Sequence, residues 1–420
     1  MNRLLPLLLF FAQAYLIQRG SHHFSKWWNP VLLLAVTVGI AWMYGRFLLN
    51  VNELKENSTS PARRWQGALL GAAGIGLCYE ELRKLFVRFS PPVKWSDVVP
   101  QLEAQFDRWA RGEMPYQPVH FETYDAYPVY MPMNWLPIGI SRFFGMDARW
   151  SGYVVLLLAV GLVGWHLWQR GKATWQTVAA VLLPSVALWS FILWKDLEIP
   201  VSYELLIAAY YLVLVAGLMS GSTTWMLAGV ILCLLSRYTL VFWLPLFALV
   251  LFHERPLRWN LWFWAAVTTA IVCIYIVPFV QHDPTILEKG VGYHNGAAIE
   301  EWKGVGDPPV SWTMEKGISF ALHLKTLFTG DMAHRVMLAR VVQASVMLAL
   351  FALGWLGYRR WRGRIPAGEF LLLMLYCVIS GFYFFGPLTY RYYLIVLLMI
   401  SAVICGRMMT KTTAQNISET

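Results

Sequence analysis

Asp97 is the carboxylate whose position in the chain best suits chemistry. It lies in a polar, aromatic and proline-rich block, residues 90–150, between long apolar runs. Val98, Leu102 and Phe106 follow it at helical spacing with polar side chains between them, which predicts an amphipathic helix in a membrane interface. An aspartate at the start of such a helix is either its N-cap or a general base that takes a proton from a hydroxyl group.

Isolated charged residues form a second group of candidates. Lys195, Arg237 and Arg391 each stand alone at the end of an apolar run. Charges near membrane depth are costly, so such side chains either extend to the surface from a helix end or face a functional cavity. Asp196 and Glu198 follow Lys195 closely, and they predict either a second acidic cluster that orients hydroxyl groups or a charge-balanced loop.

Aromatic and histidine side chains add weaker candidates. Tyr238, Tyr390 and Tyr392 flank the two arginines of that group, and His294 lies in a second polar block, residues 281–334. The histidines of this block lack a metal-ligand spacing such as His-x-x-x-His, so we expect no zinc site. A long polar loop with aromatic residues either closes over a ligand or serves as a connector between helices.

The composition places these residues in a membrane protein. Hydrophobic residues make up 58% of the 420 and charged residues 14%, whereas soluble domains average about 45–50% and about 25%. The net charge of +10 comes from basic residues in short loops, which fits the positive-inside rule and anionic headgroups better than nucleic acid. The five cysteines lie within apolar runs without metal-like spacing, so we interpret them as small buried hydrophobic residues.

The apolar runs predict an all-α integral membrane protein with about 12 transmembrane helices. The candidate spans are 4–17, 30–49, 66–86, 151–168, 174–194, 202–219, 223–236, 238–252, 259–280, 335–356, 368–385 and 388–406. The stretch 223–252 is interrupted at Arg237, so it forms either one helix or two short ones. Two helices place the most basic short loops on one side of the membrane, and the positive-inside rule therefore favours two.

This topology puts both polar blocks on the extracytoplasmic side, each with an interfacial helix, the second one near residues 318–328. The chain then divides into an N-terminal transmembrane hairpin with a cytoplasmic loop, a transmembrane core that includes the first polar block, the second polar block, the C-terminal helices and a disordered tail. These segments are residues 1–65, 66–280, 281–334, 335–409 and 410–420.

The first polar block also resembles a known family. Ser96-Asp97 is followed by Arg-Trp-x-x-Gly-Glu-x-Pro-Tyr at 108–116 and by Tyr-Pro-x-Tyr-x-Pro at 127–132. This order resembles the GT-C superfamily, multi-spanning glycosyltransferases that use polyprenyl-phosphate-linked sugars. Within it, the chain is most similar to the bacterial glycosyltransferase family 87 group, which includes mannosyltransferases.

The resemblance covers residues 66–150 best and, more loosely, 236–238 and 390–392. A hairpin in residues 1–50 precedes the helix that is normally first in that superfamily. No Asp-Glu or Asp-x-Asp motif accompanies Asp97, which argues against the metal-dependent oligosaccharyltransferase branch and against the protein mannosyltransferase branch.

The resemblance implies an inverting hexosyl- or mannosyltransferase with its active site on the extracytoplasmic face of a bacterial plasma (inner) membrane. Asp97 matches the catalytic base, and Lys195, Arg237 and Arg391 are the cations expected to hold the donor phosphate. The weaker candidates for substrate contact are Asp196, Glu198, Tyr238, Tyr390, Tyr392 and His294.

The expected partners are a polyprenyl-phosphate-linked sugar, a lipid-linked or envelope glycan acceptor, and membrane lipids, with no nucleic acid, no cofactor and no metal ion. A transporter or flippase of lipid-linked sugars is an alternative that uses the same cations but needs no base. A ligase that transfers a whole glycan is another.

Overall fold

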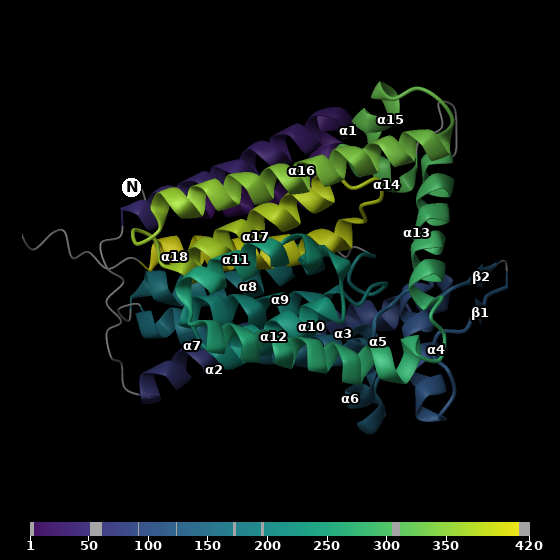
Figure 1. The fold of residues 1–420 in the computed structure, drawn as a ribbon, viewed down its shortest axis with the longest axis horizontal. Coiled ribbons are helices and arrows are strands. Elements are labelled where there is room, and N and C mark those ends of the chain that lie inside the picture. Colours follow the sequence, from purple (N-terminus) through teal and green to yellow (C-terminus); the bar gives the residue numbers. More distant parts are fainter. Residues whose placement is uncertain are drawn as a thin grey trace, which may run out of the picture.

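The computed structural model describes residues 4–50, 61–90, 92–122, 124–170, 174–194, 197–304 and 311–410. Within these ranges the chain is a bundle of helices whose axes mostly run along one direction, horizontal in Figure 1. In the same ranges, β structure is confined to an antiparallel hairpin of β1 (Val119–His120) and β2 (Asp125–Ala126). The predicted disordered tail lies, after Thr410, outside the described residues.

Seven helices of the described chain are long and apolar enough to cross a membrane, by length and composition alone. They are α1 (Leu4–Leu49), α7 (Arg149–Arg170), α8 (Trp175–Leu193), α12 (Leu257–Ile271) with its π-helical continuation η3 (Val272–Val280), α16 (Met332–Trp361), α17 (Ala367–Phe384) and α18 (Leu394–Met409), which follows the short η4 (Arg391–Tyr393). Shorter apolar helices accompany them: α9 (Glu204–Ser220), α10 (Thr223–Leu234) and α11 (Leu244–Glu254). The chain therefore has the all-α architecture of a membrane protein, while the count of about 12 spans stays a prediction.

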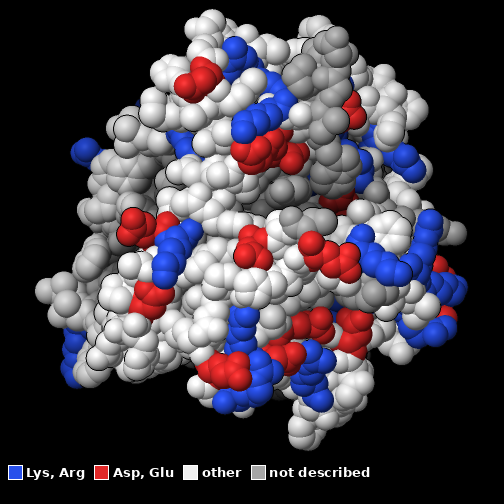
Figure 2. All heavy atoms as spheres, turned by 90° about the vertical axis from the view of Figure 1, so that its right-hand side faces the viewer, with Lys and Arg blue, Asp and Glu red and all other residues white. Residues whose placement is uncertain are grey.

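Smaller elements complete the fold. They are α2 (Pro61–Gly76), α3 (Tyr79–Arg88), η1 (Pro92–Lys94), α4 (Val98–Ala110), α5 (Pro132–Trp135), α6 (Ile138–Phe143), η2 (Tyr238–Phe242), α13 (Ile286–Lys303), α14 (Trp312–Glu315) and α15 (Ala321–Leu327). Both polar blocks lie at the same end of the bundle, on the right of Figure 1. Figure 2 views that end and shows acidic and basic side chains interspersed over it.

The first element, α1, is a helical hairpin, as predicted for the first two apolar runs. Ser25 has φ 62° and ψ 161° and separates the two halves. The side-chain amide of Gln13 in the first half donates a hydrogen bond to Thr37 of the second half at 2.9 Å and another to Tyr376 at 2.8 Å. The hairpin is therefore joined to α17 by a buried polar contact.

The predicted span 66–86 is not one continuous helix. The chain forms α2 and α3, with a turn at Leu77 and Cys78 between them. Gly74 and Gly76 precede this turn, and glycine is among the weakest helix formers, so the helix ends where the sequence is least able to continue it.

The predicted span 223–252 forms two helices, α10 and α11, joined through η2, as the charge pattern of the loops favours.

The helices differ in how much of their surface is buried, which separates central helices from outer ones. In the most apolar stretch of each helix, the share of buried residues is 94% for the span of α18 but only 17% for α16 and 22% for α12 with η3. The bundle therefore packs around α18 and leaves the long faces of α12 and α16 for the surrounding lipid.

Candidate functional site

Asp97 occupies the N-cap position of α4, as the sequence predicts, but its side chain makes no capping hydrogen bond. The carboxylate Oδ2 instead accepts a hydrogen bond from the side-chain amide of Gln101 at 2.7 Å. The backbone N–H of Val98 donates to the hydroxyl of Ser96 at 3.2 Å, so a neighbour helps to satisfy the start of the helix. The partly buried Asp97 carboxylate is therefore not used to stabilise its own helix.

Tyrosines from three separate segments surround this carboxylate. Tyr124 and Tyr130 come from the loop before α5, Tyr293 from α13 and Tyr390 from the α17–α18 connection. Burial raises the pKa of Tyr124, and the negative charge of Asp97 and its hydrogen bond to the phenol raise it further. The same carboxylate charge adds to the effect of burial in raising the pKa of Tyr293. The phenols therefore stay protonated hydrogen-bond donors next to Asp97.

Arg237 forms the cationic side of the same region. Its guanidinium makes an ion pair with the buried Glu204 at the start of α9 and lies 4.3 Å from the centre of the Tyr393 ring. Tyr130 is close enough to both charges that Asp97 raises its pKa and Arg237 lowers it, although burial has the largest effect and raises it. Tyr130 therefore lies near both the carboxylate and the arginine, and it borders a cavity together with Arg237.

A small cavity of about 20 Å³ lies beside this ion pair, room for about one water molecule. Its lining comes from α4, the α5 segment, α9 and the Tyr392–Tyr393 connection, together with Arg237. In this conformation the cavity is too small to hold more than a water molecule.

His294 of α13 faces the arginines. Burial lowers the pKa of this imidazole to about 4, and the positive charges of Arg237 and Arg340 act in the same direction. His294 is therefore neutral at physiological pH and offers one donor and one acceptor nitrogen.

Arg340 lies in the third turn of the apolar helix α16 and is half-buried. Its Nε is buried without a hydrogen-bond partner, and no ion pair forms with its guanidinium within the described part of the chain. A charge at membrane depth without a counter-ion is costly. Arg340 therefore marks a place where an anionic ligand would be strongly stabilised.

Helix α13 holds its two site residues in place through its C-terminal end. The indole N–H of the buried Trp302 donates to the carbonyl of Pro387 at 2.6 Å. Glu301 accepts hydrogen bonds from the backbone N–H and the hydroxyl of Thr313 at 3.2 and 2.9 Å. These bonds connect α13 to the α17–α18 connection and to α14, and they fix the position of the helix that carries Tyr293 and His294.

The Arg-Trp-x-x-Gly-Glu motif holds the first polar block together. The Arg108 guanidinium donates to the carbonyls of Gln117 and Pro118 at 2.5 and 2.8 Å. Arg111 and Glu113 form an exposed ion pair at 2.8 Å. This motif therefore shapes the loop that carries the site tyrosines and does not line the site itself.

Other predicted residues have different surroundings. Arg391 is buried, donates to Glu198 at 3.0 Å and to the carbonyl of Gln18 at 2.9 Å, and thereby links three segments. The roles of Arg391 in holding a phosphate and of Glu198 in orienting substrate stay predictions, and this buried ion pair already serves to link the three segments. Tyr392 is buried and stacks on Tyr390, with ring centroids 5.1 Å apart.

Lys195 and Asp196 lie outside the described residues. Tyr238 is 40% exposed and lies near Tyr116 and Tyr275. The structure thus brings together five of the predicted residues: Asp97, Arg237, His294, Tyr390 and Tyr392.

Arg340, Tyr124, Tyr130 and Tyr293 were not singled out from the sequence. For Arg340 a signal existed, because a single arginine within an otherwise apolar run is itself a reason to suspect a functional cavity. Tyr130 belongs to the Tyr-Pro-x-Tyr-x-Pro motif at 127–132. Tyr124 and Tyr293 carried no such signal, since most aromatic residues of a membrane protein sit at its interfaces.

The site contains the Asp97 carboxylate, the arginines Arg237 and Arg340, of which Arg237 is paired with Glu204, and several phenols and a neutral imidazole near these charges. No cluster of three or more metal-ligating side chains occurs among the described residues. Such a site can remove a proton at one end and stabilise an anion at the other. Comparison of the chain with models of protein families, with curated proteins and with solved structures gave no match.

Proposed function

We propose that this protein is a membrane glycosyltransferase of the hexosyl or mannosyl type. It transfers a sugar from a polyprenyl-phosphate-linked donor to a lipid-linked or envelope glycan acceptor on the extracytoplasmic side of a bacterial plasma membrane. The observation that carries the proposal is that Asp97 lies near Tyr293 of α13 while Arg340, whose Nε has no hydrogen-bond partner among the described residues, lies near the adjacent His294, so that a carboxylate and an arginine meet the same part of α13.

Asp97 is the general base of this reaction. Its carboxylate takes the proton of the acceptor hydroxyl as that oxygen attacks the anomeric carbon of the donor sugar. The bond from the anomeric carbon to the phosphate oxygen breaks, and the phosphate leaves with the electron pair. A single displacement of this kind inverts the configuration at the anomeric carbon.

Arg340 and Arg237 serve the leaving phosphate. Negative charge grows on that group as the bond breaks, and fixed cations stabilise it without reorganising. Arg340 has no counter-ion among the described residues, whereas Arg237 shares its charge with Glu204. Arg340 is therefore the stronger phosphate ligand, and neutral His294 can donate a further hydrogen bond.

The phenols near Asp97 suit a carbohydrate. Tyrosine rings stack on sugar faces, and protonated phenols donate hydrogen bonds to sugar oxygens. Tyr124, Tyr293 and Tyr390 come from separate segments that meet only in the folded chain. This arrangement favours a sugar bound between the loop before α5 and α13.

A mass-spectrometric profile of lipid-linked sugars and envelope glycans tests this function. It compares the host, a strain without the gene, and that strain carrying wild type, Asp97→Asn or Asp107→Asn at equal membrane levels. Asp107 lies on the same helix and pairs with Arg142 at 3.2 Å, so it is the matched control. We expect one glycan to disappear without the gene, and to return with wild type and Asp107→Asn only.

Two results would contradict the proposal. If the strain without the gene keeps its full glycan profile, this protein does not transfer the sugar of any glycan in that profile. A general base contributes about 10²–10⁴-fold to the rate, so full restoration by Asp97→Asn would show that Asp97 is not that base. This result would favour the flippase, which needs only the cations.

A further inference from the structure

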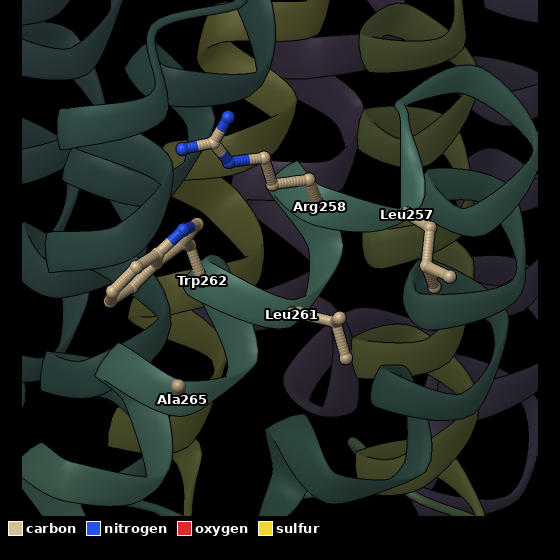
Figure 3. Close-up of a pocket in the computed structure, with 5 residues that line it drawn as sticks. All are labelled: Leu257, Arg258, Leu261, Trp262 and Ala265. Atoms are coloured by element: carbon tan, nitrogen blue, oxygen red, sulfur yellow. The ribbon is translucent and has the colours of Figure 1, made fainter.

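A second candidate binding site lies at the opposite end of the bundle, on the outer face of α12. A hollow of about 470 Å³ is bordered by Leu257, Arg258, Leu261, Trp262 and Ala265. Figure 3 shows the Arg258 and Trp262 side chains on one side of the hollow and those of Leu257 and Leu261 on the other. None of these residues belongs to the Asp97 region.

The spacing of these residues on one helix explains the shape. Arg258 and Trp262 are four positions apart and form one row, while Leu257, Leu261 and Ala265 form the next row at the same spacing. Neighbouring rows of side chains on a helix enclose a groove. The small side chain of Ala265 keeps that groove open toward the middle of the membrane.

The exposure of these side chains shows that the protein does not fill the groove. Leu257, Leu261 and Trp262 are 64%, 60% and 70% exposed. They lie on a helix apolar and long enough to cross a membrane, of which only 22% of the most apolar window is buried. A hydrocarbon chain of the bilayer is the apolar material that a membrane-spanning helix meets along this face.

The positive charge of Arg258 at one end of the groove indicates which lipid headgroup the groove would prefer. Arg258 has no ion pair or hydrogen bond to any described residue, and a second arginine, Arg255, lies just before α12, where it donates to the carbonyl of Gly221. The nearby Glu254 is already used, because Arg362 lies 3.4 Å from it and the hydroxyl of Tyr358 donates to it at 2.5 Å. A negatively charged headgroup would supply the missing counter-ion.

We propose that this groove is a binding site for one anionic phospholipid of the leaflet at that end of the bundle. The Arg258 guanidinium binds the phosphate, the Trp262 indole lies at the level of the headgroup, and one acyl chain runs between the two rows toward Ala265. This site is independent of the proposed transferase reaction, because it lies at the other end of α12 from α13.

Native mass spectrometry of the full-length protein, stripped of lipid in detergent, tests the proposal. Phosphatidylglycerol and phosphatidylcholine with the same acyl chains are titrated into wild type, Arg258→Gln, Ala265→Phe and Arg360→Gln. Arg360 is an exposed arginine near the end of α16 that does not border the groove, so it is the matched control.

For wild type we expect one phosphatidylglycerol to bind more tightly than phosphatidylcholine. Arg258→Gln should weaken phosphatidylglycerol binding about fivefold, which corresponds to about 1 kcal/mol for one arginine near a membrane surface, and weaken phosphatidylcholine binding less, because the choline cation offsets the charge of its phosphate. Ala265→Phe fills the groove and should weaken both lipids, while Arg360→Gln should match wild type.

Equal affinity of wild type for the two lipids overturns the proposal, as does wild-type binding of phosphatidylglycerol by Arg258→Gln and Ala265→Phe. An equal loss in Arg360→Gln also overturns it, because the effect would then come from net charge. Thermal unfolding of each variant verifies that the protein is folded.

Discussion

The Asp97 carboxylate accepts a hydrogen bond from the Gln101 side chain at 2.7 Å and makes no capping bond to the backbone of α4. An aspartate at an N-cap position usually contributes to helix stability through such a bond. Here the amide of Gln101, one turn along the helix, holds the carboxylate in place. The position therefore serves the orientation of the carboxylate more than the stability of the helix.

This relationship predicts that Asp97→Asn costs little stability. The apparent free energy of unfolding should change by less than about 0.5 kcal/mol, because no capping bond is lost. Asp331→Ala is the contrasting variant, since the Asp331 carboxylate caps α16 by accepting from the backbone N–H of His334 at 2.8 Å, and its loss should cost about 1 kcal/mol. Thermal unfolding of both proteins in the same detergent measures this. A larger loss for Asp97→Asn would make Asp97 a structural residue.

The sequence predicts local features of this site better than its long-range contacts. Helix α4 was predictable because its apolar residues repeat at helical spacing, which is local information. The pairing of Arg391 with Glu198 was not predictable, because the two residues are 193 positions apart and the sequence pattern does not indicate which charged residues pair in the folded chain. Arg340 was overlooked because a run with a single charge still counts as a span.

Arg391→Gln should destabilise the protein strongly. Removal of one partner leaves Glu198 as a buried charge without its ion pair to Arg391, a change that typically costs about 3–5 kcal/mol. The double variant Glu198→Leu with Arg391→Met should lose less than the single one, because both buried charges are then gone. Thermal unfolding compares the two. If Arg391→Gln kept wild-type stability but lost donor affinity, the phosphate-binding role expected from the sequence would be favoured instead.

The pH dependence of stability should report on His294. Its pKa falls from the ordinary 6.5 to about 4 in the folded protein, so between these values the unfolded chain binds a proton that the folded chain does not. Stability from this group is therefore complete above pH 6.5 and declines as the pH falls toward 4, by up to about 3 kcal/mol. Unfolding of wild type and His294→Gln from pH 4 to 8 isolates this contribution, because other groups titrate equally in both. Parallel curves would contradict the prediction.

The helices α2 and α7 approach each other closely where two glycines face each other. A Cβ atom at Gly164 would lie 2.4 Å from the carbonyl oxygen of Gly67. Gly164→Ala should therefore force the helices apart and cost about 1–3 kcal/mol. Gly76→Ala is the matched control, because a Cβ atom there meets nothing within 4 Å and should be neutral or slightly stabilising. Thermal unfolding distinguishes them, and equal stability of the two variants would show that α2 and α7 can separate without cost.

Arg340 should decide how well the donor phosphate is held. Arg340→Gln removes a charged hydrogen-bond donor worth about 1.5–3 kcal/mol, so kcat/KM for the lipid-linked donor should fall about 10- to 100-fold. Arg340→Lys keeps the charge without the planar fork and should recover part of that loss. Arg335→Gln on the same helix is the control: its guanidinium donates to the carbonyls of Gly330 and Lys325 at 2.9 and 3.2 Å, so its loss should lower stability and leave kcat/KM unchanged. Because the phosphate gains charge as the sugar leaves, kcat should fall along with kcat/KM in Arg340→Gln. If Arg340→Gln kept the wild-type kcat/KM, the donor phosphate would not be bound by Arg340 of α16.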